Sequence, residues 1–156
     1  MIVKLNNLNR LVAEEIRSVF QASYAVEAKL LNAIDFPPLK RTVDAFVETN
    51  TRFYGYQIDG ETIAVIEILN DKTATHIQSL VVLPDHFRKG LGHKLVQCIL
   101  DTYDSKLFTV ETGLANRPAI QLYEKFGFKK TKIWDTDHGI RKIKFELQGG
   151  TAYSSF

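Results

Sequence analysis

The chain of 156 residues contains one cysteine, Cys98, so an intrachain disulfide is excluded. A chain without disulfides is typical of a reducing compartment, and the first residues lack the charged-then-apolar layout of a signal peptide. No apolar run approaches the length that spans a membrane. The sequence therefore predicts a cytoplasmic protein with no membrane partner.

An excess of charge of one sign is also lacking. Lys and Arg number 20 and Asp and Glu number 18, which leaves a formal charge of +2. This balance predicts no nucleic-acid partner, because such a surface needs a concentrated basic stripe. The histidines have no ligand spacing with a cysteine or carboxylate cluster, so we expect no metal site. They are His76, His86, His93 and His138.

The hydrophobic share of 45% over this length has the balance of one compact domain. We expect residues 1–148 to form this domain and residues 149–156 to be a mobile tail. No repeat or low-complexity tract divides the chain.

A short glycine-containing loop, residues 88–93 (RKGLGH), follows an apolar run and opens a periodic apolar segment. The run Leu80–Leu83 predicts a strand, and residues 91–103 predict a helix. Such a loop presents free backbone N–H groups at a helix N-terminus, where the helix dipole also favours an anion. The stretch therefore indicates a phosphate site, although an ordinary strand-to-helix turn with a solvated basic pair explains it equally well when it is taken alone.

A second stretch, residues 110–128 (VETGLANRPAIQLYEKFGF), favours the phosphate site over the ordinary turn. Together the two stretches resemble the GNAT superfamily of acyl-CoA-dependent N-acyltransferases, whose pattern here is Asn at a strand end, then Ala, Leu-Tyr and Gly-Phe. The resemblance covers Thr75 to Phe128. The family usually has Gln or Arg at the position of Phe87, but the loop holds pyrophosphate mainly through main-chain N–H groups. Walker-type and Rossmann fingerprints are absent.

The resemblance implies an α+β fold of α/β/α sandwich type. Its mixed, mostly antiparallel sheet has splayed central strands and is flanked by about four helices. Periodicity and turn residues predict the individual elements. Helices are expected from about residue 9 past 24 toward 31, at 43–47, at 91–103 and after Asn116, and strands at 2–5, 53–58, 62–69, 76–83, 107–112, 128–134 and 139–147.

The resemblance also implies acetyl-CoA as the acyl donor. Its pantetheine arm is expected between the splayed strands, where an N–H group near Val82 can polarise the thioester carbonyl. A core role for residues 80–82 is compatible with this, because the contacts are main-chain, and Asn116 can also cap a helix. The expected donor-binding residues are Leu80, Val81, Val82, Arg88, Lys89, Gly90, Leu91, Gly92, His93, Asn116 and Tyr123.

Three side chains are predicted to be catalytic. Tyr123 corresponds to the tyrosine that protonates the departing CoA thiolate in many family members; the alternative is a helix tyrosine packed between neighbours. Glu111 corresponds to a glutamate of the ribosomal-protein alanine acetyltransferases, and His76 to a histidine of the serotonin N-acetyltransferases. Either residue can take a proton from the acceptor amine. We favour Glu111, for which a solvated strand-end carboxylate is the alternative.

The acceptor pocket of the family is formed by the first helices and the last two strands. Here these offer Tyr24, Glu27, Phe36, Trp134, Asp135, Asp137 and His138. Strict alternation along the preceding strand places Ile77 with Ser79 and Val81, on the face opposite His76.

The predicted function is an N-acetyltransferase that moves an acetyl group from acetyl-CoA to a primary amine of a small molecule or protein by direct attack. The alternative is a non-catalytic CoA-binding regulatory or scaffold module, with a general nucleotide binder as a third reading. A homodimer is compatible with any of them.

Overall fold

The computed structural model describes residues 1–149 and contains a seven-stranded sheet in the order β1-β2-β3-β4-β5-β7-β6. The strands are β1 (Ile2–Leu5), β2 (Arg52–Ile58), β3 (Glu61–Asn70), β4 (Ala74–Val82), β5 (Leu107–Gly113), β6 (Lys129–Asp135) and β7 (Arg141–Gln148). The helices are α1 (Arg10–Leu30), α2 (Val43–Glu48), α3 (Leu91–Thr102) and α4 (Arg117–Lys125), with short 3-10 helices η1 (Pro37–Lys40) and η2 (Pro84–His86). Apart from Gly149, the predicted C-terminal tail lies outside the described residues.

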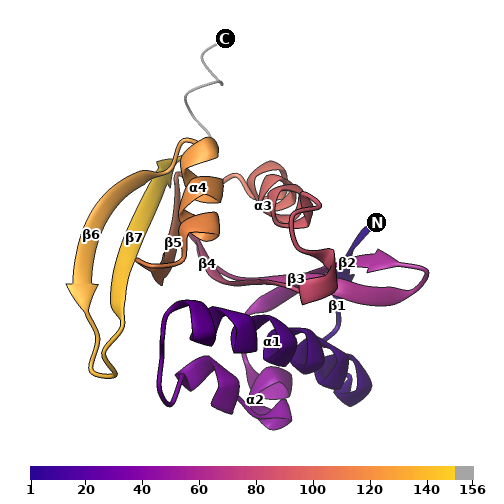
Figure 1. Cartoon of the computed structure of the whole chain (residues 1–156). Coiled ribbons are helices and arrows are strands. Elements are labelled where there is room, and N and C mark those ends of the chain that lie inside the picture. Colours follow the sequence, from indigo (N-terminus) through magenta and orange to yellow (C-terminus); the bar gives the residue numbers. More distant parts are fainter. Residues whose placement is uncertain (150–156) are drawn as a thin grey trace.

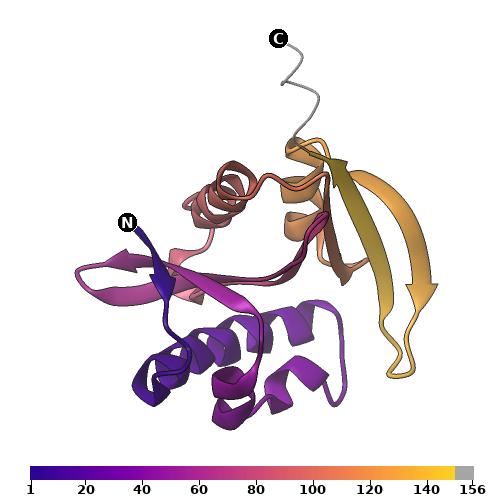
Figure 2. The same cartoon turned by 180° about the vertical axis from the view of Figure 1, so that it is seen from behind.

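The helices form a layer on each face of the sheet, with α3 and α4 on one side and α1 and α2 on the other (Figure 1). One apolar core lies under α3 and α4, and a second lies between the sheet and the α1–α2 layer. Seen from behind, β1 and the β6–β7 hairpin lie at opposite ends of the sheet (Figure 2). The predicted α+β fold class is confirmed.

Local capping chemistry explains where α1 and α4 begin. The side chain of Asn9 accepts hydrogen bonds from the N–H groups of Leu11 and Val12, so α1 starts at the next residue. Asn116 caps α4 in the same way, with Pro118 in the first turn, where a missing N–H is not needed. Pro37 and Pro38 do more than follow the end of α1: they open η1, a 3-10 helix that the sequence did not predict.

The predicted splay of the central strands is confirmed by their pairing. β4 and β5 are parallel neighbours only over Ala74–Ile77 and Leu107–Val110. Beyond this point β4 continues beside β3 as far as Val82, while β5 continues beside β7 as far as Gly113. The two strands therefore separate in the middle of the sheet, and their facing main-chain groups have no strand partner there.

Strict alternation along β4 was a wrong expectation. The pairing with β3 shifts between Glu67, which faces Ser79, and Ile68, which faces Ile77, so Gln78 is an extra residue. Such a bulge reverses the side-chain direction along the strand. As a result Ile77 packs in the α3–α4 core, whereas Val81 packs in the α1–α2 core.

Among residues 1–149, none of the helices combines the length and the apolar character that a membrane crossing requires.

Candidate functional site

A cavity of about 480 Å³ opens where β4 and β5 separate. Its walls come from the splayed ends of these strands, the second half of α1, η1, one face of α4 and the turn between β6 and β7. Segments that are far apart in the sequence thus meet at the strand gap, between the two helical layers.

The α1 wall of the cavity is one face of the helix. Phe20, Tyr24, Glu27 and Leu31 line the cavity and follow one another at intervals of three or four residues, which places them on one side of α1. The end of this face is seated directly on β5, because a Cβ atom at Gly113 would lie 2.5 Å from Leu31 Cδ2. Only glycine permits so close an approach at this point.

Tyr123 reaches the cavity from α4 and is only 3% exposed. Its ring packs against Phe128 and Phe145, at centroid distances of 5.5 and 6.3 Å. Within residues 1–149 its hydroxyl group has no hydrogen-bond partner. Burial, together with the nearby groups of Tyr24 and Glu27, raises the pKa of Tyr123. The hydroxyl therefore stays protonated near neutral pH and can donate a proton into the cavity.

Glu111, the side chain favoured as the base from the sequence, also lines the cavity. Its side chain is 35% exposed, and its Oε1 lies 4.0 Å from the Nζ atom of Lys142. The carboxylate thus faces a compensating positive charge.

His76 lies outside the cavity wall that holds Tyr123 and Glu111. Its Nδ1 atom is 2.7 Å from the Thr109 hydroxyl on the neighbouring strand. Burial lowers the pKa of His76, against the opposing effect of Glu111. The imidazole is therefore neutral near pH 7. It lies close enough to Glu111 for that charge to act on it, but it does not line the cavity that Tyr123 and Glu111 share.

The last N–H group of β4 lies on the side of the strand away from β3, although Val82 itself does not line the cavity. The N–H group of Leu83 donates to Ile63 O on β3, at 2.9 Å, so the preceding N–H group points away from β3. That group, on Val82, donates instead to Ser23 Oγ of α1, at 3.3 Å. Of the neighbouring residues, Leu80 lines the cavity and the side chain of Val81 is buried in the α1–α2 core.

Asn116 lines the cavity and caps α4 at the same time. Its Oδ1 atom accepts the N–H group of Ala119 at 3.3 Å. The amide nitrogen of the side chain has no acceptor among the residues that the structure describes. The cap and a ligand contact can therefore be served by one residue, as the sequence suggested.

The loop of residues 88–93, between η2 and α3, presents a row of free backbone N–H donors. Arg88 and Gly90 both have left-handed backbone conformations, with φ of 63° and 77°. From Arg88 to His93, the backbone N–H groups donate to no acceptor in residues 1–149. Left-handed residues within such a row make a concave anion site, and at Gly90 a glycine takes this conformation without strain.

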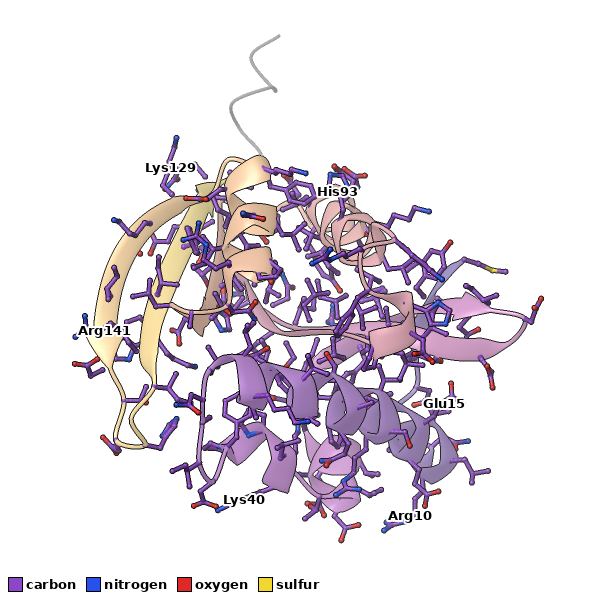
Figure 3. All side chains as sticks on the ribbon, in the orientation of Figure 1. Arg10, Glu15, Lys40, His93, Lys129 and Arg141 are labelled. Atoms are coloured by element: carbon purple, nitrogen blue, oxygen red, sulfur yellow. The ribbon has the colours of Figure 1, made fainter. Side chains whose placement is uncertain are left out.

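The start of α3 lies against α4 and β4. A Cβ atom at Gly92 would lie 3.4 Å from Leu122 Cδ2 and 3.5 Å from Leu80 Cδ2. The ring of His93 stacks on Phe126 with centroids 4.5 Å apart. Figure 3 shows His93 on the opposite side of the sheet from Arg10 and Lys40, which project from the α1–α2 layer. The donor row is thus held by packing between the helices.

The predicted acceptor residues fall into two groups. Tyr24, Glu27, Phe36 and His138 line the cavity, whereas Trp134, Asp135 and Asp137 do not. Asp135 is instead paired with Arg141 at 2.8 Å, and Lys132 lies 4.9 Å above the Trp134 ring. These two pairs belong to the outer surface of the β6–β7 hairpin.

Glu27 has a chemical character that the sequence analysis missed. It is half-buried, and its carboxylate makes no hydrogen bond or ion pair within residues 1–149. Burial raises the pKa of Glu27 to about 7, although Lys142 acts in the opposite direction. The sequence did carry a signal for this carboxylate: Glu27 is an acidic residue on the same helix face as Phe20 and Tyr24.

A metal-binding cluster is not seen among the described residues: nowhere in 1–149 do three or more His, Cys, Asp or Glu side chains gather as ligands.

The sequence and the fold of this chain are similar to those of known proteins. The sequence profile of the Acetyltransferase (GNAT) family matches residues 13–128. The UPF0157 protein YqkA of Bacillus subtilis is 32% identical over 148 residues, which cover 94% of this chain and 43% of YqkA. The chain thus spans less than half the length of that relative.

Two solved structures illustrate the likeness of the fold. The ribosomal-protein-S18-alanine N-acetyltransferase of Escherichia coli superimposes with a TM-score of 0.77 at 20% identity, over 97% of this chain and 95% of the other. A GNAT family acetyltransferase from Elizabethkingia anophelis with acetyl-CoA bound gives 0.62 at 20% identity, over 76% and 87%.

Proposed function

The chain belongs to the acetyltransferase (GNAT) family, and on this premise we propose that it transfers an acetyl group from acetyl-CoA to a primary amine. One observation carries the proposal: a protonated tyrosine without a hydrogen-bond partner faces the cavity at the splay of β4 and β5. In this proposal residues 1–148 form the acetyltransferase unit. The acceptor is a small molecule or a protein with a primary amine.

The acyl donor fits the groups that surround the strand gap. The free N–H groups of residues 88–93 suit the pyrophosphate, and Arg88 and Lys89 add positive charge there. The gap between β4 and β5 suits the pantetheine arm, whose amides can bond to the main-chain groups of Leu80 and Val82 that have no partner on β5. For Val82 this requires the Ser23 hydroxyl to give way.

The chemistry is a direct attack of the amine on the thioester. A main-chain N–H group of β4 polarises the carbonyl, and Tyr123 donates its proton to the departing thiolate. Glu27, and Glu111 beside Lys142, place two carboxylates in the cavity, which suits a cationic amine. We assign no proton transfer to His76, because its ring is engaged by Thr109 outside the cavity.

Two assays test the proposal together. Calorimetry is expected to show that acetyl-CoA binds far more tightly than ATP or NAD, and a free-thiol assay over a panel of amines is expected to show turnover. Tight binding of CoA without turnover of any amine would favour the non-catalytic binding module instead. Equal affinity for all three nucleotides would remove the acetyl-CoA assignment.

A matched pair of variants localises the donor site. In Gly92→Val the new side chain meets only the flexible ends of Leu122 and Leu80, so the fold is expected to survive while acetyl-CoA binding falls strongly. Gln97→Val places the same side chain on the exposed part of α3 and is expected to bind normally. Equal affinities for the two folded variants would place the pyrophosphate elsewhere.

A further inference from the structure

We propose that Glu27 is the residue that accepts the proton of the acceptor amine, which enters the cavity as an alkylammonium ion. The inference rests on the proposed acetyltransferase function and assigns to one α1 side chain a role that sequence comparison gave to Glu111.

The placement of Glu27 is the first argument. It lies on the cavity face of α1, between Tyr24 and Leu31, across the strand gap from α4. Its charge influences the pKa of Tyr123, so the proton acceptor and the proton donor of the reaction share one small cavity. An amine between them can lose a proton on one side while the thiolate gains one on the other.

The lack of a partner is the second argument. The Glu111 carboxylate lies 4.0 Å from Lys142 and is 35% exposed, so its charge is compensated and solvated. The half-buried carboxylate of Glu27 has no such partner in residues 1–149. An unpaired, partly desolvated carboxylate holds a proton more readily, and its pKa of about 7 suits a base that works near neutral pH.

The other charged and titratable groups that face this cavity do not neutralise Glu27. Arg41 is engaged by Glu67, with both N–O distances at 2.8 Å. Lys142 favours the charged form of Glu27, but burial outweighs it. The groups that line the same cavity are Tyr24 on α1, Arg41 after η1, Glu111 on β5, Tyr123 on α4, His138 in the β6–β7 turn and Lys142 on β7.

The proton balance of the reaction closes with these residues. Glu27 first takes one proton from the ammonium group. The free amine then forms the C–N bond while the C–S bond breaks and Tyr123 protonates the sulfur. The nitrogen, which still carries one proton too many, returns it to the Tyr123 oxygen. Glu27 finally releases its proton to solvent, so the net products are the amide, CoA thiol and one proton.

The test is a pH–rate profile of three Glu→Gln variants with an amine that wild type accepts. Wild type is expected to show an acidic limb with a midpoint near the pKa of Glu27, about 7. Glu27→Gln is expected to lower kcat about 100-fold near neutral pH and to remove that limb. Glu111→Gln is expected to raise KM for the amine but to keep that limb. Glu14→Gln, on the exposed side of α1, is the matched control and is expected to behave as wild type.

The possible results separate the assignment of Glu27 from the proposed acetyltransferase function. If wild type turns over and the acidic limb survives in Glu27→Gln, or disappears in Glu111→Gln, the assignment of Glu27 is overturned while the acetyltransferase function stands. If wild type binds acetyl-CoA but acetylates no amine, both proposals fall. A carbon-13 titration of the side-chain carboxyls supplies a readout apart from turnover. One carboxyl is expected to titrate at about 7 and to be missing in Glu27→Gln, and its absence from wild type would also overturn the assignment.

Discussion

Two polar regions lie beside each other beneath α1, and burial has opposite consequences in them. The first is the buried glutamate network, which we define as Glu67 with Arg41, Thr51 and Ser79. The second is the cavity that contains Glu27 and Tyr123. Arg41 and Ser79 belong to the network and also line the cavity, so the two regions share a wall.

In the buried glutamate network every carboxylate oxygen has partners. Glu67 is 0% exposed and accepts two hydrogen bonds from Arg41, one from Thr51 at 2.6 Å and one from Ser79 at 2.9 Å. The guanidinium of Arg41 also lies 4.0 Å above the ring of Phe46. The network therefore fixes the segment between η1 and α2 on the sheet.

In the cavity, by contrast, two polar groups lack a hydrogen-bond partner among the described residues. The carboxylate of Glu27 and the hydroxyl of Tyr123 make no hydrogen bond within residues 1–149. A buried polar group with partners stabilises one conformation, whereas one without partners costs stability and is free to react. Burial alone therefore does not distinguish a structural carboxylate from a reactive one; the hydrogen-bond partners do.

Arg41→Ala is expected to have the largest effect, because it leaves the fully buried charge of Glu67 without its main partner. We expect a loss of about 3–5 kcal/mol in the free energy of unfolding, measured by urea denaturation. Lys40→Ala, at the preceding and exposed position, is expected to change stability by less than about 0.5 kcal/mol. Similar losses for the two variants would mean that the network does not hold this segment.

Tyr123→Phe is expected to act on chemistry rather than on stability. It removes one hydroxyl that has no partner and keeps the packing against Phe128 and Phe145. We expect kcat to fall roughly tenfold to a thousandfold, with acetyl-CoA affinity nearly unchanged, because the lost interaction strengthens as charge develops on sulfur. Wild-type kcat in an assay limited by chemistry would return Tyr123 to a packing role.

Glu27→Gln is expected to increase stability, and only at higher pH. The folded protein holds a proton on Glu27 up to about 7, whereas the ordinary pKa is 4.5, so the folded state binds more protons in this window and loses stability as pH rises through it. The variant has no such loss. At about pH 8 we expect it to be more stable than wild type by about 1–2 kcal/mol, since solvent still screens part of the carboxylate, and at about pH 4.5 equally stable. Chemical denaturation at several pH values measures this, and parallel curves for the two proteins would contradict it.

Thr51→Val is expected to have the smallest effect. It is nearly isosteric and removes the hydrogen bonds of the Thr51 hydroxyl to Glu67 and to the Thr49 hydroxyl, while both Arg41 bonds remain. We expect a loss of about 1 kcal/mol in the free energy of unfolding and no change in kcat, because Thr51 does not line the cavity. A change in the rate without a change in stability would show that the two regions are less separate than their contacts suggest.

Much of the local structure was predictable because its causes lie within a few residues. Asn9 and Asn116 cap the helices that follow them, and the Asp59-Gly60 turn joins β2 to β3. The loop of residues 88–93 was indicated by its glycines between an apolar run and a periodic helix, whereas the splayed strands were implied by the resemblance. By contrast, the bulge at Gln78 depends on the pairing with β3, and it was missed.

The sequence by itself determined the family, the fold class and the loop of residues 88–93 whose N–H groups have no acceptor in residues 1–149, because the spacing of glycines, caps and apolar residues acts over short distances along the chain. Only the tertiary structure decided which carboxylate is chemically distinct. Glu67, Glu27 and Glu111 are the same residue type, and their difference comes from partners contributed by distant segments: Arg41 for the first, none among the described residues for the second and Lys142 for the third. Protonation depends on desolvation and on opposite charge within a few ångströms, and these distances are set by how α1, β3, β5 and β7 pack.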